Sequence, residues 1–343
     1  MGTERHTAVS GEAIPPVTAE STMRAIVQDR YGSAEVLRLA RIARPEIGDH
    51  DVLLRVHAAG LDRGTWHLMT GQPYLLRPVA GLRGPRNPVP GLDVSGTVVA
   101  AGPAVTRFSV GDEVFGFGRG TFADYAAAHE DKLAAKPAGA SFEQAAVVPV
   151  SAATALRALT DVGQVTAGQK VLITGASGGV GSYAVQLATA YGAEVTGVCS
   201  TAKLDLVRSL GATDVIDYTR DDFADGTHHY DLIIDIAGSP RLSRLRRALT
   251  ATGTAVLTGG EDSGNWTGME RQIRALAVSP FLRQRLIMFT PRQRSSDLDR
   301  LTGFIDAGTV TPSIGASYPL DQVPEAMRHL AAGKARGKIA ITI

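Results

Sequence analysis

The chain has 343 residues and a formal net charge of +1, so it lacks the positive excess typical of proteins that bind nucleic acids or anionic membranes. Its single cysteine, Cys199, excludes an intrachain disulfide and a cysteine-cluster zinc site, and it fits a reducing, cytoplasmic location. No apolar run approaches the roughly 18 residues of a membrane-spanning helix. The length suffices for two domains with separate cores.

The first half of the chain is rich in short strands. Residues 1–22 mix Gly, Pro, Thr, Ser and Glu without hydrophobic periodicity, which predicts a disordered tail. Residues 23–150 alternate apolar segments with glycine turns and predict a β-barrel-like domain. Its strands are expected at 24–28, 51–57, 92–100, 110–118 and 125–128.

Two other segments of this half differ from the strands. A helix is expected over 62–70, and Asp62 could cap its start. Residues 74–90, rich in Pro, Gly and Arg, should form a long loop. Such a loop is either functional or a plain surface insertion.

The second half alternates strands with helices, which predicts a parallel, doubly wound sheet over residues 151–290. Two helices broken at Pro149 should precede it, within 141–159. The apolar segment Arg285 to Phe289 is a candidate edge strand, through which a homodimer is expected by analogy. Residues 291–343 should form helices at 297–307 and 321–332, with Asp321 as a cap, and a strand at 338–343. In the second helix, Val323, Met327 and Leu330 share one face.

A glycine-rich turn lies between an apolar strand and a helical pattern, within residues 170–186. Strand, glycine turn and helix in this order form a dinucleotide-binding unit, whose helix start offers free N–H groups to phosphates. The residues expected at the pyrophosphate are Ala176, Ser177, Gly178, Gly179, Val180 and Gly181. An ordinary surface turn is the plain alternative. Gly-x-Ser-x-Gly also matches a hydrolase elbow with Ser177 as nucleophile, but that interpretation leaves Gly181 unexplained.

The end of the next strand indicates which dinucleotide binds. An NAD site usually places an acidic residue there, about 20 residues after the glycines, to hold the ribose 2′-OH. This chain has Ser200, Thr201 and Lys203 instead, which can hold a 2′-phosphate by hydrogen bonds and charge. The sequence therefore predicts NADP(H), although Lys203 could also be a solvated lysine of the next helix.

These motifs resemble the zinc-free quinone oxidoreductases, a branch of the medium-chain dehydrogenase/reductase superfamily that includes zeta-crystallin. The resemblance covers nearly the whole chain from Met23. It rests on 168–172, 176–181 with Gln186, 90–96, 111–114, Thr154-Ala155, Tyr218 and 333–338. It implies a Rossmann domain inserted into a GroES-like barrel, with the C-terminal segment returning to the barrel and the cofactor in the cleft between them.

The resemblance also implies roles for single residues. Tyr218 would join Ser200 and Lys203 around the 2′-phosphate, and Thr154 would lie near the nicotinamide. Thr258, Gly259 and Lys338 would complete the cofactor site. Asp62 stands where many relatives have an Asn beside nicotinamide and substrate. The zinc-ligand positions of the family's alcohol dehydrogenases are occupied here by Gly60-Leu61-Asp62 and Gly91-Leu92-Asp93, so no metal is expected.

The predicted activity is NADPH-dependent hydride transfer to a quinone or an α,β-unsaturated carbonyl compound, since without zinc nothing polarises a plain alcohol. Asp62 or Tyr74 is expected to supply the proton, with water as the alternative, although Asp62 could be a helix cap only. Trp66, Tyr74 and Phe117 form either a substrate wall or part of the core. Two alternatives remain open: a biosynthetic tailoring reductase for a larger substrate, and an NADPH-binding sensor or structural protein without turnover.

Overall fold

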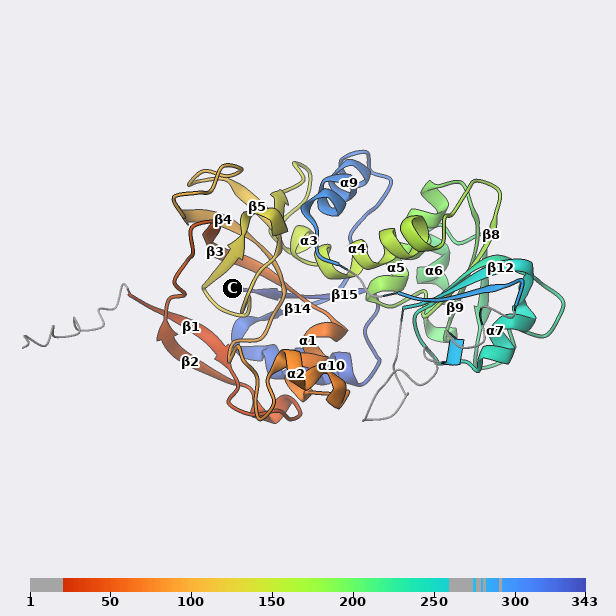
Figure 1. Ribbon diagram of the computed structural model, residues 1–343, viewed down its shortest axis with the longest axis horizontal. Helices are drawn as coiled ribbons and strands as arrows, with labels where there is room; N and C mark the ends of the chain where they lie inside the picture. Colours follow the sequence, from red (N-terminus) through yellow and green to blue (C-terminus); the bar gives the residue numbers. More distant parts are fainter. Residues whose placement is uncertain (1–20, 259–273, 276–278, 280–281, 290–291) are drawn as a thin grey trace, which may run out of the picture.

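The computed structural model describes residues 21–258, 274–275, 279, 282–289 and 292–343. Two lobes lie side by side: a β-rich lobe that contains the red-to-yellow part of the chain, and an α/β lobe in green and cyan (Figure 1). The blue C-terminal part runs back into the β-rich lobe, and its end lies there. No helix within the described residues combines the length and apolar character needed to cross a membrane.

The α/β lobe is built on a six-stranded parallel sheet. Its strands are β8 (Lys170–Thr174), β9 (Glu194–Cys199), β10 (Asp214–Asp217), β11 (Tyr230–Asp235), β12 (Leu249–Leu257) and β13 (Arg285–Met288). They lie in the order β10-β9-β8-β11-β12-β13, and every neighbouring pair is parallel. Counted from the first strand this is 3-2-1-4-5-6, the order of dinucleotide-binding sheets. The predicted fold is thus confirmed, as is the edge position of β13, while the dimer stays a prediction.

Helices cover both faces of this sheet, so successive residues of a strand enter different cores. The helices on the sheet are α5 (Gly179–Ala190), α6 (Leu204–Ser209) and α7 (Leu242–Ala248). Helix α4 (Pro149–Arg157) packs on α5, and α9 (Ser295–Asp306) packs on α4 and on β7. Val171 and Ile173 of β8 pack with the residues of α4 and α5, whereas Leu172 between them packs with Leu245 of α7. Burial on both faces explains why β8 is continuously apolar instead of alternating.

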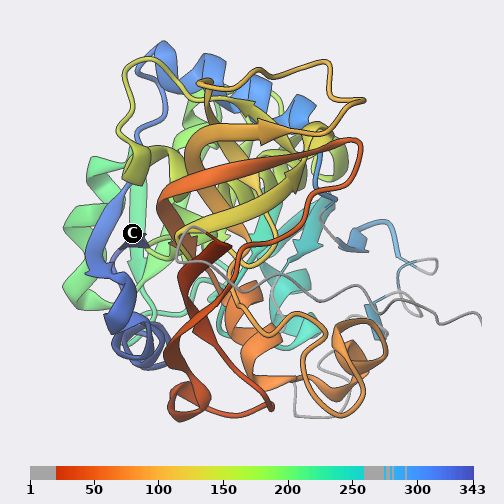
Figure 2. The ribbon, with the colours of Figure 1, turned by 90° about the vertical axis from the view of Figure 1, so that its left-hand side faces the viewer.

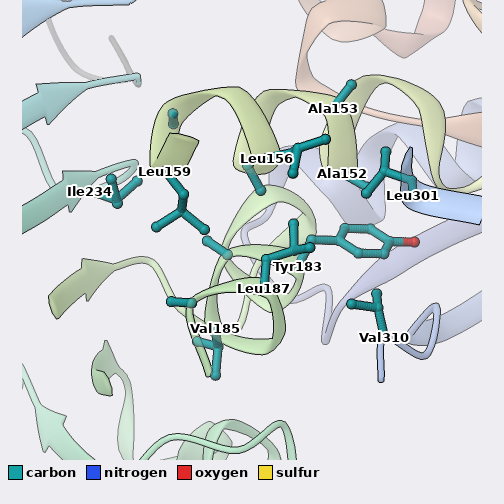
Figure 3. Packing of buried hydrophobic residues seen from close by; sticks show 14 of the residues in the cluster. Ala152, Ala153, Leu156, Leu159, Tyr183, Val185, Leu187, Ile234, Leu301 and Val310 are labelled. Carbon is teal, nitrogen blue, oxygen red and sulfur yellow. The ribbon is translucent and has the colours of Figure 1, made fainter. Parts of the chain in front are cut away.

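Helices α4 and α5 cross closely (Figure 3). Leu156 of α4, and Leu159 in the turn Ala158–Val162 that follows it, point toward α5, whose Leu187 and Tyr183 ring belong to the same core. The Tyr183 hydroxyl, although fully buried, donates a hydrogen bond of 3.2 Å to the carbonyl of Val147. This bond joins the start of α5 to the segment that enters α4.

The β-rich lobe contains a seven-stranded sheet in the order β14-β15-β3-β4-β5-β7, with β6 paired to β3, and a separate β1–β2 pair. Strand β15 pairs antiparallel with β3, so the C-terminal segment does return to the barrel as expected. The strands are β1 (Thr22–Val27), β2 (Arg38–Ala43), β3 (Asp51–Leu61), β4 (Asp93–Ala101), β5 (Glu113–Phe117), β6 (Tyr125–His129), β7 (Leu133–Ala135), β14 (Ile314–Pro319) and β15 (Lys338–Thr342). Strands β2, β7 and β14 were not predicted, because β2 and β14 are exposed at alternate positions and β7 has three residues.

The helices of this lobe are α1 (Arg63–Thr70), α2 (Arg77–Ala80), α3 (Phe142–Ala146) and α10 (Val323–Ala331). Figure 2 shows α1 and α2 in orange, low on the side of the β-rich lobe. Val323, Met327 and Leu330 of α10 do share the face that packs on the barrel. The capping role of Asp321 is wrong, because Asp321 lies inside a 3₁₀ turn, Leu320–Gln322, and Gln322 occupies the N-cap position without a side-chain bond.

The structure differs from the sequence prediction at several boundaries. Thr22, placed in the tail, is the first residue of β1, while residues 1–20 lie outside the described residues. The predicted boundary between residues 150 and 151 falls inside α4. The expected loop of 74–90 contains a 3₁₀ turn, Tyr74–Leu76, followed by α2, whose second residue is Pro78.

Candidate cofactor site

The glycine turn after β8 has the geometry that a dinucleotide requires. Gly175 has a φ of +66°, in the left-handed region that favours glycine. A Cβ on Gly181 would lie 2.1 Å from the carbonyl oxygen of Gly175, so only glycine lets α5 start this close to the turn. Helix α5 has Gly178 as N-cap and no side-chain cap, which leaves its first N–H groups and its positive dipole end available to an anion.

Ser177 lies in this turn and is 6% exposed. Its carbonyl accepts a hydrogen bond of 2.9 Å from Gly337 N, which ties the turn to the segment before β15. Across the described ranges, no histidine or carboxylate is hydrogen-bonded to the Ser177 side chain. A nucleophilic serine needs such a base, so this geometry gives the hydrolase interpretation no support.

A buried lysine lies against the same turn. Lys338 of β15 has a side chain that is 1% exposed, and its Nζ donates to Ser151 Oγ at 3.0 Å and faces Asp93 Oδ2 at 3.5 Å. A Cβ on Gly179 would lie 3.0 Å from Lys338 Cδ and 3.2 Å from Ser151 Oγ. A cation from the barrel therefore lies beside the predicted phosphate-binding turn, and its role in binding the cofactor stays a prediction.

Asp93 of β4 was not predicted as a functional residue. It is fully buried, and its Oδ1 accepts a hydrogen bond of 2.9 Å from Val150 N in the first turn of α4. Burial raises the pKa of the Asp93 carboxyl to about 8, with a smaller contribution from the charge of Asp62, although Lys338 opposes the shift. The sequence signal was the motif Pro90-Gly91-Leu92-Asp93, which was used to indicate the family and to argue against zinc but not to assign a role to Asp93.

The residues predicted for the 2′-phosphate lie at the end of β9. Ser200 precedes a 3₁₀ turn, Thr201–Lys203, without capping it through its side chain, and Tyr218 is 60% exposed. Lys203 Nζ donates to the carbonyls of Gly333, at 3.1 Å, and Ala335, at 2.7 Å. Two of its three donor hydrogens are thus used to connect the two lobes, and one remains for a ligand.

A second cation, Arg336, lies near Lys203 and was not included in the prediction. Burial lowers the pKa of Lys203, and the nearby positive charge of Arg336 adds to this effect. Arg336 is exposed and belongs to the closing motif 333–338, so a second cation is available for a phosphate. The sequence carried this signal in the motif, but we assigned only Lys338 from it.

Thr201 occupies a position that differs from the prediction. Its hydroxyl donates to the carboxylate of Asp217, which also accepts from Thr219 N at 3.0 Å and Thr219 Oγ1 at 2.7 Å. The hydrogen bond from Thr201 is the first cause of a lowered pKa at Asp217. In this arrangement the hydroxyl hydrogen of Thr201 cannot also be donated to a phosphate.

The remaining residues predicted to bind the cofactor or the substrate come from different parts of the chain. Thr154 is 8% exposed, and its hydroxyl donates to Val150 O at 2.6 Å inside α4. Thr258 follows β12, and both its N–H and its hydroxyl donate to Asp235 O at 3.0 Å. Gly259 lies outside the described residues. Trp66 is partly buried on the core of the barrel, with the Arg63 guanidinium 5.2 Å from its ring centroid.

Asp62 is the N-cap of α1, as predicted. It is 5% exposed, and its Oδ1 accepts from Thr65 N at 2.8 Å while Oδ2 accepts from Thr65 Oγ1 at 3.2 Å. Both carboxylate oxygens therefore serve the start of the helix, and the catalytic role of Asp62 stays a prediction. Tyr74 is 36% exposed and lies under the guanidinium of Arg77, 4.5 Å from its ring centroid, while Phe117 is a core residue.

The expectation that the protein binds no metal rests on the sequence. Among the residues that the structure describes, no three His, Cys, Asp or Glu side chains come together as a metal ion requires. The absence of zinc stays a prediction, which rests on the two motifs Gly60-Leu61-Asp62 and Gly91-Leu92-Asp93.

Comparison with known proteins agrees with this geometry. Residues 48–138 match the family model described as alcohol dehydrogenase GroES-like domain, and residues 210–341 match the one described as zinc-binding dehydrogenase. The chain is 31% identical to a 2-methylene-furan-3-one reductase of Solanum lycopersicum, over 97% of this chain and 82% of the relative. It is 32% identical to a chloroplastic NADPH-dependent alkenal/one oxidoreductase of Arabidopsis thaliana, over 97% and 83%.

A solved structure gives the same result. The quinone oxidoreductase from Coxiella burnetii superposes with a TM-score of 0.83 at 27% identity, covering 94% of this chain and 99% of its own. The order of the parallel strands, the glycine turn and these matches together show that the chain belongs to the zinc-free quinone oxidoreductase branch of the medium-chain dehydrogenase/reductase superfamily.

Proposed function

We propose that this protein is an NADPH-dependent oxidoreductase that transfers a hydride to a quinone or to an α,β-unsaturated carbonyl compound. The observation that carries the proposal is the uncapped start of α5, packed on the glycine turn with the buried Lys338 beside it. The names of the relatives supply the substrate class.

The residues present fit the cofactor at both of its phosphate groups. The first N–H groups of α5 and Lys338 would hold the pyrophosphate, where no side chain at Gly179 blocks the approach. Ser200, Tyr218, Arg336 and the remaining donor of Lys203 would hold the 2′-phosphate. Bound there, NADPH supplies the hydride.

The protein's own contribution is to orient the reactants and to manage a proton. Accepting a hydride leaves negative charge on the carbonyl oxygen of the acceptor, and a proton must then be added to complete the product. Asp62 would have to take up a proton before donating one, since both of its oxygens now accept hydrogen bonds. The hydroxyl of Tyr74 and water are the other proposed donors.

The assay that tests the proposal follows NADPH absorbance, with NADH in parallel, against a quinone, a cyclic enone and a simple ketone. Turnover is expected with the quinone or the enone and not with the ketone, and NADPH should be preferred. If NADPH raises the melting temperature but no acceptor on the panel is reduced, the sensor or structural alternative is favoured instead.

A larger, apolar substrate is the second candidate, and one observation favours it. Leu75, Val79 and Leu82 in the segment after α1 are 55%, 76% and 72% exposed. Exposed aliphatic side chains this close together in sequence often mark a binding surface. A tailoring reductase would show kcat/KM values that rise with the length of the acceptor's alkyl chain, whereas a simple quinone reductase would not.

A homodimer through β13 and a cytoplasmic location also belong to this proposal. The first rests on the edge position of β13 and the second on the single cysteine.

A further inference from the structure

The buried pair of Asp93 and Lys338 connects the two lobes at the cofactor site. Lys338 comes from β15 of the barrel and Asp93 from β4, and through Ser151 and Val150 they contact the first turn of α4. Both side chains are at most 1% exposed. A charge buried this deeply is stable only with a partner, so the charge of each group affects the protonation state of the other.

This ion pair is incomplete. Asp93 Oδ2 accepts no hydrogen bond in the part of the chain that the structure describes, and it faces Lys338 Nζ at 3.5 Å. Oδ1 has the single bond from Val150 N. The other charged group that acts on Asp93 is Asp62, whose negative charge disfavours ionisation. Tyr183 of α5 is also near, and burial raises its pKa well above the usual value, with a smaller contribution from Asp93.

A bound pyrophosphate would change this balance. It brings negative charge to the start of α5, and Gly179 in that first turn is the residue against which the stem of Lys338 lies. Added negative charge attracts Lys338 and makes an ionised Asp93 still less favourable in a site that excludes water. A neutral Asp93 carboxyl no longer competes with the pyrophosphate for the positive charge of Lys338.

We propose that NADPH binding is coupled to the uptake of one proton from solvent by Asp93. Lys338 then exchanges its pairing with the Asp93 carboxylate for an interaction with the cofactor's pyrophosphate. The inference rests on the proposed cofactor site. Asp93 is a positioning residue in this scheme, because it acts on the cofactor through Lys338 and not by contact.

The pH range in which the proton is taken up follows from the pKa of Asp93 in the free protein. Because the Asp93 pKa is about 8 before binding, the carboxyl is already largely protonated at pH 6.5, and binding there should take up almost no proton at this site. As the pH rises above 8 the uptake should approach one proton, and the Kd for NADPH should rise about eightfold between pH 7.5 and pH 9. At pH 8.5 the 2′-phosphate does not interfere, since the second pKa of a phosphate monoester is about 6.

The test is calorimetric titration of the protein with NADPH at pH 8.5 in two buffers of different ionisation enthalpy, which gives the number of protons exchanged. The wild-type protein should take up a proton fraction well above zero, and Asp93→Asn should take up none while binding NADPH with a Kd that no longer rises with pH. Asp297→Asn is the matched control. Asp297 is also buried, its pKa is raised by burial, and it faces Arg157 at 3.8 Å at the other end of α4. This variant should keep the uptake.

Lys338→Met provides a second variant in case Asp93→Asn does not fold. Without its cation Asp93 is protonated already in the free protein, so uptake disappears, and NADPH binding is weakened at every pH. NADPH binding without proton uptake in the wild type, or uptake that persists in Asp93→Asn, would overturn the inference and leave the cofactor site in place. Failure of NADPH to bind at all would overturn the proposed function as well.

Discussion

The two regions proposed to bind the cofactor's phosphates are built in opposite ways. The pyrophosphate turn consists of backbone: Gly175 and Gly181 set its shape, and the N–H groups of α5 are its donors. The 2′-phosphate region consists of side chains, and most of these already have partners, as Lys203 and Thr201 show. A backbone site is fixed once the chain folds, whereas a side-chain site must exchange existing hydrogen bonds for those of its ligand.

The largest effect is expected at the backbone site. Gly181→Ala would place a Cβ 2.1 Å from Gly175 O, so either α5 or the turn must move. We expect a loss of stability of about 1–3 kcal/mol and of NADPH binding by more than tenfold, measured by thermal melting and by titration. Gly303→Ala in α9 is the control, because its Cβ would meet nothing within 4 Å, and it should be neutral or slightly stabilising. Equal behaviour of the two variants would mean that the close packing is unimportant.

At the side-chain site, Lys203→Ala should weaken NADPH binding by about 10–100-fold, as expected for the loss of a charge-assisted hydrogen bond. NADH has no 2′-phosphate, so its binding should fall only a few-fold. That smaller loss comes from the missing bonds of Lys203 to Gly333 and Ala335. Dissociation constants for both cofactors measure this directly. Lys170→Ala is the control: Lys170 is the exposed first residue of β8, at the opposite end of the strand from the glycine turn. Equal losses for NADPH and NADH in Lys203→Ala would remove the 2′-phosphate assignment.

Asp62→Ala should cost about 1 kcal/mol of stability through the lost helix cap, while Asp62→Asn should keep the cap and most of the stability. The comparison of their melting temperatures checks this role. Turnover of the enone separates the two roles of Asp62: if Asp62→Asn keeps its kcat, the residue is a cap only, and a large loss of kcat at unchanged stability makes it the proton donor.

The smallest effect is expected for Thr201→Val. Since the Thr201 hydroxyl is donated to Asp217, its removal should change the NADPH Kd by less than about threefold and reduce stability by about 1 kcal/mol. A tenfold weaker affinity for NADPH, with NADH unaffected, would show that the hydroxyl turns to the phosphate when the cofactor binds. The side-chain site would then be rearranged on binding, in contrast to the backbone site.

The sequence predicted the backbone site well because glycine spacing and apolar periodicity are local properties. Gly181 was identified from its neighbours alone, and the structure gives it the close approach expected. What the sequence could not predict depends on residues distant in the chain. Asp217 lies 16 residues from Thr201 and Lys338 lies 187 from Ser151, and only the folded protein brings each pair into contact. The exposed strand β2 was missed for a related reason, because it has no continuous apolar side.

The return of β15 to the barrel has a consequence for synthesis of the protein. Every strand of the six-stranded sheet precedes β15 in the chain, so the glycine turn can form while Lys338 is still on the ribosome. At that stage the barrel lacks the strand that pairs with β3, and the phosphate turn lacks its buried cation. The last strand of the chain thus lies between β3 and β14, and its entry adds to the barrel and to the proposed cofactor site together.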